Sequence, residues 1–158
     1  MTGFGYDSHR LAEGEELILG GVKIPGNIGT IAHSDGDALL HALCDAILGA
    51  AALGDIGEHF PDSDPKYKNA GSSFFVKEAV KMMKKKGLKL INIDASIILE
   101  KPKLSPYKEA MRQAIADICE ISKEYVNIKA KTNEKMGFTG RGEGVAAYCV
   151  VQAGENMS

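Results

Sequence analysis

The chain has 158 residues, of which 44% are hydrophobic and 25% are charged, and its formal net charge at pH 7 is −2. This length predicts one domain, residues 1–158, that is large enough to bury its own core. The near-neutral charge excludes an electrostatic nucleic-acid partner, and no apolar segment is long enough to predict a membrane span. The cysteines at positions 44, 119 and 149 lie in apolar segments and are expected to be buried free thiols.

The first half of the chain predicts two strands, a buried helix and a functional loop. We expect them at residues 3–9, 16–24, 35–53 and 54–65, in that order. Gly20-Gly21 lies between two apolar triplets and indicates a turn. Ser34 and Asp35 are suited to cap the helix. The loop is rich in Gly, Asp and Pro, and a connection of this length favours a function of its own.

The second half predicts two helices and three strands, at residues 72–86, 90–99, 105–121, 126–132 and 145–151. Alternation along the second of these segments predicts one buried face, made of Ile91, Ile93, Ala95, Ile97 and Leu99. Ser105 and Pro106 are suited to the start of the helix that follows. The order of elements predicts an α/β (α+β) fold, with a single mixed sheet and three main helices packed on one face.

Asp7, His9 and His41 form the first group of residues that could bind a metal or take part in catalysis. Asp7 and His9 are two residues apart on a predicted strand and therefore share a face. His41 lies on an otherwise apolar helix, with Asp37 and Asp45 four residues away on either side. One carboxylate and two imidazoles suit a catalytic Zn²⁺ with an open fourth position, and either aspartate could hold the His41 tautomer. The alternative is that these histidines are ordinary hydrogen-bonded polar residues.

Two further segments could bind phosphate. Residues 33–37 (His-Ser-Asp-Gly-Asp) present a helix N-terminus, which is an anion site or simply an N-cap. Residues 137–144 contain four glycines near Arg141, and Glu134 supplies an oxygen ligand of the kind that Mg²⁺ prefers. This segment could equally be a glycine-rich hairpin loop. Together the three groups favour phosphoryl-transfer chemistry, in which positioning and charge stabilisation dominate.

With these segments assembled, the chain resembles the 2-C-methyl-D-erythritol 2,4-cyclodiphosphate synthases nearly end to end. The segments that carry the resemblance are residues 5–11, 19–25, 32–37 with His41, 52–57, 60–62, 100–103 and 137–144. The resemblance implies an enzyme of the non-mevalonate isoprenoid pathway, a phosphorus-oxygen lyase. It would convert 4-diphosphocytidyl-2-C-methyl-D-erythritol 2-phosphate to the 2,4-cyclodiphosphate and CMP. The 2-phosphate of the substrate would itself attack the β-phosphorus, so no protein nucleophile is needed.

The resemblance also implies roles for individual residues. Asp7, His9 and His41 would hold Zn²⁺, and Glu134 would bind Mg²⁺ or Mn²⁺ together with the substrate diphosphate. His33 and Thr132 would stabilise the transition state. The full set of expected substrate contacts is Asp7, Ser8, His9, His33, Ser34, Asp55, Ile56, Gly57, Phe60, Pro61, Asp62, Ser63, Asp64, Leu99, Glu100, Lys101, Pro102, Lys103, Leu104, Ser105, Lys131, Thr132, Asn133, Glu134, Phe138 and Arg141.

The resemblance further implies a homotrimer with active sites at its subunit interfaces. Phe138 and Arg141 would line a cavity on the three-fold axis that accommodates an isoprenoid diphosphate. The N-terminal segment lacks the features of a secretory signal or transit peptide, which favours bacterial cytoplasm over a mature plastid form. Two other functions stay open: hydrolysis by water at a related metal site, and a trimeric module that binds cytidine nucleotides or isoprenoid diphosphates without turnover.

Overall fold

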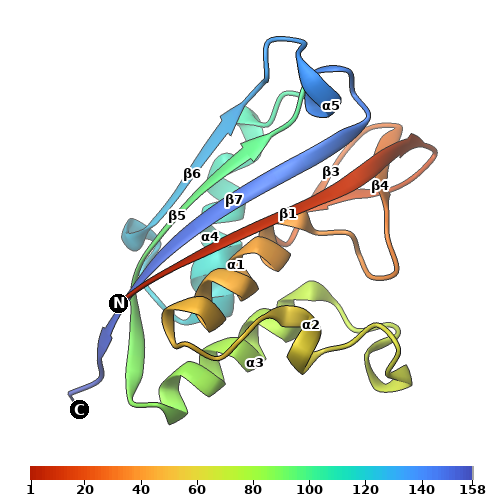
Figure 1. Ribbon diagram of the computed structural model, residues 1–158. Helices are drawn as coiled ribbons and strands as arrows, with labels where there is room; N and C mark the ends of the chain where they lie inside the picture. The colour runs from red at the N-terminus through yellow and green to blue at the C-terminus, as the bar shows by residue number, and fades with distance from the viewer. Residues whose placement is uncertain (158) are drawn as a thin grey trace.

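The architecture is one five-stranded mixed sheet with helices packed against it (Figure 1). The computed structural model describes residues 1–157. The strand order is β4-β1-β7-β5-β6, in which only the β5–β6 pair is parallel among the described residues. The strands are β1 (Thr2–Glu13), β4 (Ile28–Ile31), β5 (Leu88–Ile98), β6 (Val126–Lys131) and β7 (Gly144–Glu155), while β2 (Leu17–Leu19) and β3 (Val22–Ile24) form a separate hairpin.

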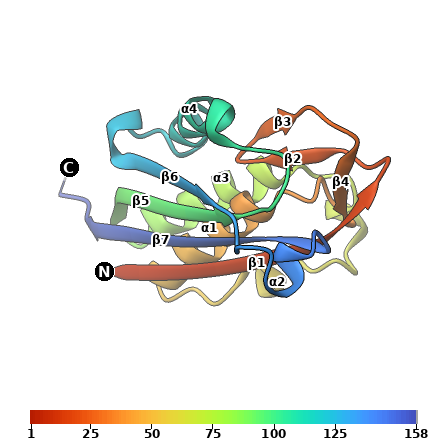
Figure 2. The ribbon, with the colours of Figure 1, turned by 90° about the horizontal axis from the view of Figure 1, so that it is seen from above.

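Three longer helices cover one face of the sheet, which confirms the predicted fold class (Figures 1 and 2). They are α1 (Ala38–Ala50), α3 (Ser72–Lys85) and α4 (Lys108–Cys119); the short helices are α2 (Ile56–His59), α5 (Gly137–Gly140), η1 (Pro65–Tyr67), η2 (Ser105–Tyr107) and η3 (Lys123–Tyr125). Helix α1 is buried almost all round, because it lies between the sheet and α3. Among residues 1–157, no helix combines the length and apolarity needed to cross a membrane.

Two glycines allow α1 to approach β1 unusually closely. Gly3 and Gly5 lie on the inner face of β1, and a Cβ atom on either would come within 1.8 Å of a backbone oxygen of α1. The same inner face continues, two residues at a time, to Asp7 and His9. The close approach therefore brings the first turn of α1, which carries His41, directly against these two side chains.

The N-cap of α1 is Asp37, so the prediction of Ser34 or Asp35 was wrong. The Asp37 carboxylate accepts hydrogen bonds from the backbone N–H groups of Leu40 at 2.9 Å, Gly20 at 2.9 Å and Gly21 at 2.7 Å. It thus caps the helix and holds the glycine turn between β2 and β3 at the same time. Its side chain is fully buried, and this burial raises the pKa of Asp37 to about 6 despite the three donors.

Some predicted boundaries and faces also need correction. Ile91 was expected on the buried face of β5, but a register shift between Leu90 and Asn92 turns its side chain outward, and it is 40% exposed. Strand β4 was not predicted, and the loop 54–65 contains the short helix α2. The three cysteines are buried and free, as predicted.

Candidate metal centre

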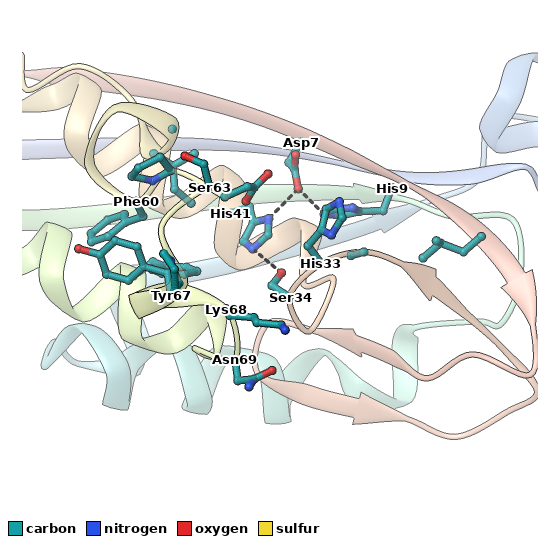
Figure 3. Close-up of a pocket in the computed structure, with 18 residues that line it drawn as sticks. Asp7, His9, His33, Ser34, His41, Phe60, Ser63, Tyr67, Lys68 and Asn69 are labelled. Atoms are coloured by element: carbon teal, nitrogen blue, oxygen red, sulfur yellow. Dashed lines mark hydrogen bonds and ion pairs between the residues drawn. The ribbon is translucent and has the colours of Figure 1, made fainter.

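Asp7, His9 and His41 converge where β1 meets the first turn of α1 (Figure 3). The Asp7 Oδ2 atom lies 2.8 Å from His9 Nε2 and 3.2 Å from His41 Nδ1. One ligand atom from each residue lies within 4.8 Å of the other two. Side-chain exposures of 28%, 17% and 16% leave the cluster open to one side only.

The chemistry of this cluster fits a bound cation. His9 Nε2 is buried and lies 2.8 Å from Asp7 Oδ2, but within residues 1–157 no contact of this nitrogen has hydrogen-bond geometry. Ligands that surround a tetrahedral zinc ion at about 2 Å are themselves roughly 3.3 Å apart. The observed separations of 2.8 and 3.2 Å are near that spacing. Two imidazole nitrogens and one carboxylate oxygen are also a donor set that zinc accepts with its fourth position open.

The electrostatics of the cluster favour charged groups. Burial by itself raises the pKa of Asp7, but the hydrogen bond of His41, the close contact of His9 and the charges of both rings outweigh it, so the pKa lies below its ordinary value. Burial lowers the pKa of His41, but the hydrogen bond and charge of Asp7, with the charges of Asp37 and Asp35, raise it overall. Because metal ligands bind in their deprotonated form, a metal ion would compete with protons for these ligand atoms.

The second nitrogen of His41 is held by partners that sequence reasoning did not identify. His41 Nε2 lies 2.8 Å from the Ser72 hydroxyl, which in turn donates to Asp35. Neither the Asp37 nor the Asp45 carboxylate, the two candidates for this role, forms a hydrogen bond with the His41 ring. Asp37 caps α1, and Asp45 instead accepts a hydrogen bond of 2.8 Å from the Ile56 N–H. Ser72 gave no sequence signal because it reaches His41 only through the packing of α3 on α1.

The cluster forms one wall of a cavity of about 1070 Å³ (Figure 3). Many of the expected substrate contacts line it: Asp7, His9, His33, Ser34, Ile56, Gly57, Phe60, Pro61, Asp62 and Ser63. The prediction missed other lining residues: Ile31, Ala32, Pro65, Tyr67, Lys68, Asn69 and Phe75. Among the described lining residues, Lys68 is the single lysine or arginine, and its amino group points toward Ser34 in Figure 3.

Several expected contacts near the cavity lie beside it rather than in its wall. Asp55 caps α2 by accepting a hydrogen bond of 3.0 Å from the Glu58 N–H, and Asp64 caps η1. Ser8 lies between Asp7 and His9 on β1, so its side chain points to the opposite face of the sheet. None of these three residues lines the cavity.

A second group of expected site residues lies away from this cavity, where the parallel strands β5 and β6 end. The segments that follow these strands are joined by hydrogen bonds from Leu99 N to Lys131 O, at 2.9 Å, and from Asn133 N to Glu100 Oε2, at 3.3 Å. The group comprises residues 99–105 and 131–134 together with Phe138 and Arg141. Within residues 1–157, no member of this group lines the cavity beside the metal cluster.

Most polar side chains of this second group are exposed. Thr132 and Glu134 stand at the surface, and Glu134 has a left-handed backbone with φ of 52°. Arg141 forms an ion pair of 3.1 Å with Glu143, which lowers the pKa of that glutamate. The described residues therefore contain two separate clusters of expected site residues, and the first of them lines the large cavity.

Comparison with known proteins agrees with the resemblance drawn from the sequence. A family model described as the YgbB family matches residues 1–153. The 2-C-methyl-D-erythritol 2,4-cyclodiphosphate synthase of Alkaliphilus metalliredigens is 54% identical over 156 residues, which are 99% of this chain and 98% of that protein. The bifunctional IspDF from Campylobacter jejuni has a TM-score of 0.93 at 47% identity and covers 98% of this chain, which spans 42% of that longer protein.

A CDP-bound structure of 2C-methyl-D-erythritol-2,4-cyclodiphosphate synthase is similar over its whole length. Its TM-score is 0.91 at 38% identity, over 98% of this chain and 100% of that one. The fold and the cavity thus define an α/β protein with a candidate metal centre between its first strand and its first long helix. The chain belongs to the YgbB family, and the resemblance to the cyclodiphosphate synthases is confirmed.

Proposed function

We propose that this protein converts 4-diphosphocytidyl-2-C-methyl-D-erythritol 2-phosphate to 2-C-methyl-D-erythritol 2,4-cyclodiphosphate and CMP, and that residues 1–158 act as one catalytic domain. The observation that carries the proposal is the convergence of Asp7, His9 and His41, with an unpartnered buried nitrogen, at the wall of a large cavity. The names of its relatives supply the product, 2-C-methyl-D-erythritol 2,4-cyclodiphosphate. The bacterial sources of these relatives support a bacterial cytoplasmic location.

Zinc is the ion that we propose for the three ligands, where it would supply Lewis-acid polarisation of a phosphate oxygen. His33, at the cavity wall, is placed to donate a hydrogen bond to a phosphate. Lys68, which also lines the cavity, can neutralise phosphate charge. The 2-phosphate of the substrate is the nucleophile and CMP is the leaving group, so the chain has only to hold both ends of the substrate in line.

The remaining half of the active site comes, in this proposal, from an adjacent subunit of a homotrimer. Thr132 and Glu134 are exposed and lie outside the cavity of their own chain. In a cyclic trimer, one surface of each subunit meets a different surface of the next, so the second cluster can complete a neighbour's cavity. Glu134 would then hold Mg²⁺ or Mn²⁺ with the substrate diphosphate, and residues 99–105 would surround the cytosine.

An apolar face of the sheet supports the assembly. Phe4, Tyr6, Tyr148 and Val150 alternate with buried residues on β1 and β7, and 61%, 43%, 41% and 41% of their surfaces are exposed. The Tyr6 and Tyr148 rings lie 5.0 Å apart, so the residues form a continuous patch. Exposed apolar patches of this kind mark interaction sites. A three-fold arrangement would bury the patch of each subunit around the axis. A cavity there, lined by Phe138 and Arg141, would take an isoprenoid diphosphate.

The proposal is tested by metal analysis of the purified protein together with an assay of CMP release. We expect about one tightly bound zinc per chain, and turnover that also requires Mg²⁺ or Mn²⁺. Phosphorus NMR identifies the product. A linear phosphate would indicate hydrolysis by water, and binding of cytidine nucleotides without CMP release, with both metals present, would indicate a non-catalytic module. Either result contradicts the proposal.

A further inference from the structure

We propose that Ser72 and Asp35 are positioning residues that hold His41 in the one tautomer able to bind the metal. The inference rests on the zinc site proposed above and extends it to two residues outside the ligand set. Ser72 is the first residue of α3 and is fully buried, and Asp35 lies in the turn before α1. The two residues meet behind His41, on the side of the ring that faces away from Asp7.

Hydrogen bonds connect His41 to Ser72 and Ser72 to Asp35, and the Asp35 carboxylate determines which atom is the donor in each of them. A carboxylate can only accept hydrogen bonds. The Asp35 carboxylate accepts from the Ser72 hydroxyl through one oxygen, and from the Ser72 N–H, at 3.0 Å, through the other. The proton of the hydroxyl is therefore committed to Asp35. Only a lone pair of Ser72 Oγ is left to face His41 Nε2, which lies 2.8 Å away.

This direction decides which nitrogen of His41 carries the proton. Because Ser72 can only accept at that contact, Nε2 must donate, and the neutral ring must leave Nδ1 without a proton. Nδ1 is the atom that faces Asp7, at 3.2 Å. The chain thus presents the lone pair of Nδ1 to the metal position and fixes the plane of the ring. The Ser34 hydroxyl, at 3.4 Å from Nε2, is too distant to replace Ser72.

The arrangement also links the ligand to the wall of the cavity. Ser72 directly follows the segment that contains Phe60, Tyr67 and Asn69, which line the cavity. Asp35 directly follows His33 and Ser34, which line it on another side. The contact between Ser72 and Asp35 joins these two segments behind His41, so the ring orientation depends on both of them.

The test is to measure zinc affinity by competition with a chromogenic chelator in Ser72→Ala, Asp35→Asn and the double variant. Removing a group that orients a ligand costs about 10- to 100-fold in metal affinity, and we expect a loss in this range for Ser72→Ala. In Asp35→Asn the amide can donate a hydrogen bond from its NH₂ group to Ser72 Oγ. The Ser72 hydroxyl can then donate to His41 Nε2, so the tautomer is no longer fixed. We expect a smaller loss of zinc affinity in this variant. The double variant should bind no more weakly than Ser72→Ala, because Asp35 acts through Ser72.

Two controls separate a positioning role from a structural one. Ser73→Ala makes the same change one residue further along α3 and should keep the zinc affinity of the wild type. The ¹⁵N spectrum of His41 in the zinc-bound protein should show a protected Nε2 proton, which becomes exchangeable in Ser72→Ala but not in Ser73→Ala. If the wild type binds zinc and Ser72→Ala binds it equally well, this inference is overturned. If the wild type binds no zinc, the proposed function itself is wrong.

Discussion

The two clusters of expected site residues differ in what completes them. Asp7, His9 and His41 come from elements that pack on one another, and their ligand atoms lie within 4.8 Å in a single chain. Thr132 and Glu134 are exposed at the ends of parallel strands, away from that cavity. The first cluster is therefore a product of folding, whereas the second would, in the proposed trimer, be completed by the cavity of an adjacent subunit. This difference predicts which changes act within one subunit and which act between subunits.

Replacing a ligand should have the largest effect. His41→Ala removes one of three protein ligands, and we expect it to abolish stoichiometric zinc binding. CMP release should fall at least about 10³-fold, since such an ion contributes several kcal/mol to the transition state. Metal analysis and the CMP assay measure this. The matched control is His59→Ala, which should leave zinc bound. His59 lies outside the cluster, and its Nε2 atom is 2.6 Å from the Leu53 carbonyl oxygen. Full zinc content in His41→Ala would refute the ligand assignment.

Mixing two inactive variants should restore activity if the clusters act across subunits. His41→Ala disables the first cluster and Glu134→Gln the second. When the two are unfolded, mixed in equal amounts and refolded, an adjacent pair of intact clusters forms at about a quarter of the sites of a cyclic trimer. We therefore expect up to about a quarter of the wild-type rate of CMP release. Each variant refolded alone is the control, and no recovery in the mixture would place both clusters in one subunit.

The close contact between strand and helix that forms the first cluster can be tested with a glycine. A Cβ atom in Gly5→Ala would lie 1.8 Å from the Ala42 carbonyl oxygen, so β1 and α1 must separate. We expect a loss of about 3 kcal/mol in the free energy of unfolding, at the upper end of overpacking costs, and weaker zinc binding. Urea unfolding measures the first effect. Gly49→Ala is the control, because its Cβ would lie 3.8 Å from Gly3, an ordinary contact.

The buried Asp37 predicts a smaller effect that depends on pH. Its pKa is raised from 3.8 to about 6 in the folded protein, so between these values the folded state binds more protons than the unfolded state. The contribution of Asp37 to stability is therefore fully present below about pH 4 and is lost as the pH rises through 6.

Urea unfolding of the wild type and Asp37→Asn between pH 4 and pH 7 measures this contribution directly. The difference between their free energies of unfolding should shrink by a few kcal/mol over that range, at 1.36 kcal/mol per pKa unit, and stay constant above it. A difference that stays constant or grows would show that the three N–H donors outweigh the burial of the carboxylate.

Local patterns in the sequence predicted much of the fold. The helix over residues 72–86 ends where its lysines and glycine indicate, as α3 (Ser72–Lys85). The Gly20-Gly21 turn and the mixed sheet were also predicted correctly. Ile91 was placed on the wrong face, because one bulge in β5 reverses the alternation before it and leaves no trace in the pattern of apolar residues.

By itself, the sequence determined most of the longer elements, their order and the shared face of Asp7 and His9, since these follow from periodicity and turn chemistry along the chain. The tertiary structure alone decided that Asp37 caps α1, that Asp45 holds α2 and that Ser72, supported by Asp35, is the partner of His41. The physical reason is that a hydrogen bond depends on distance in space. Residues 35 and 72 are brought together only when α3 packs on α1.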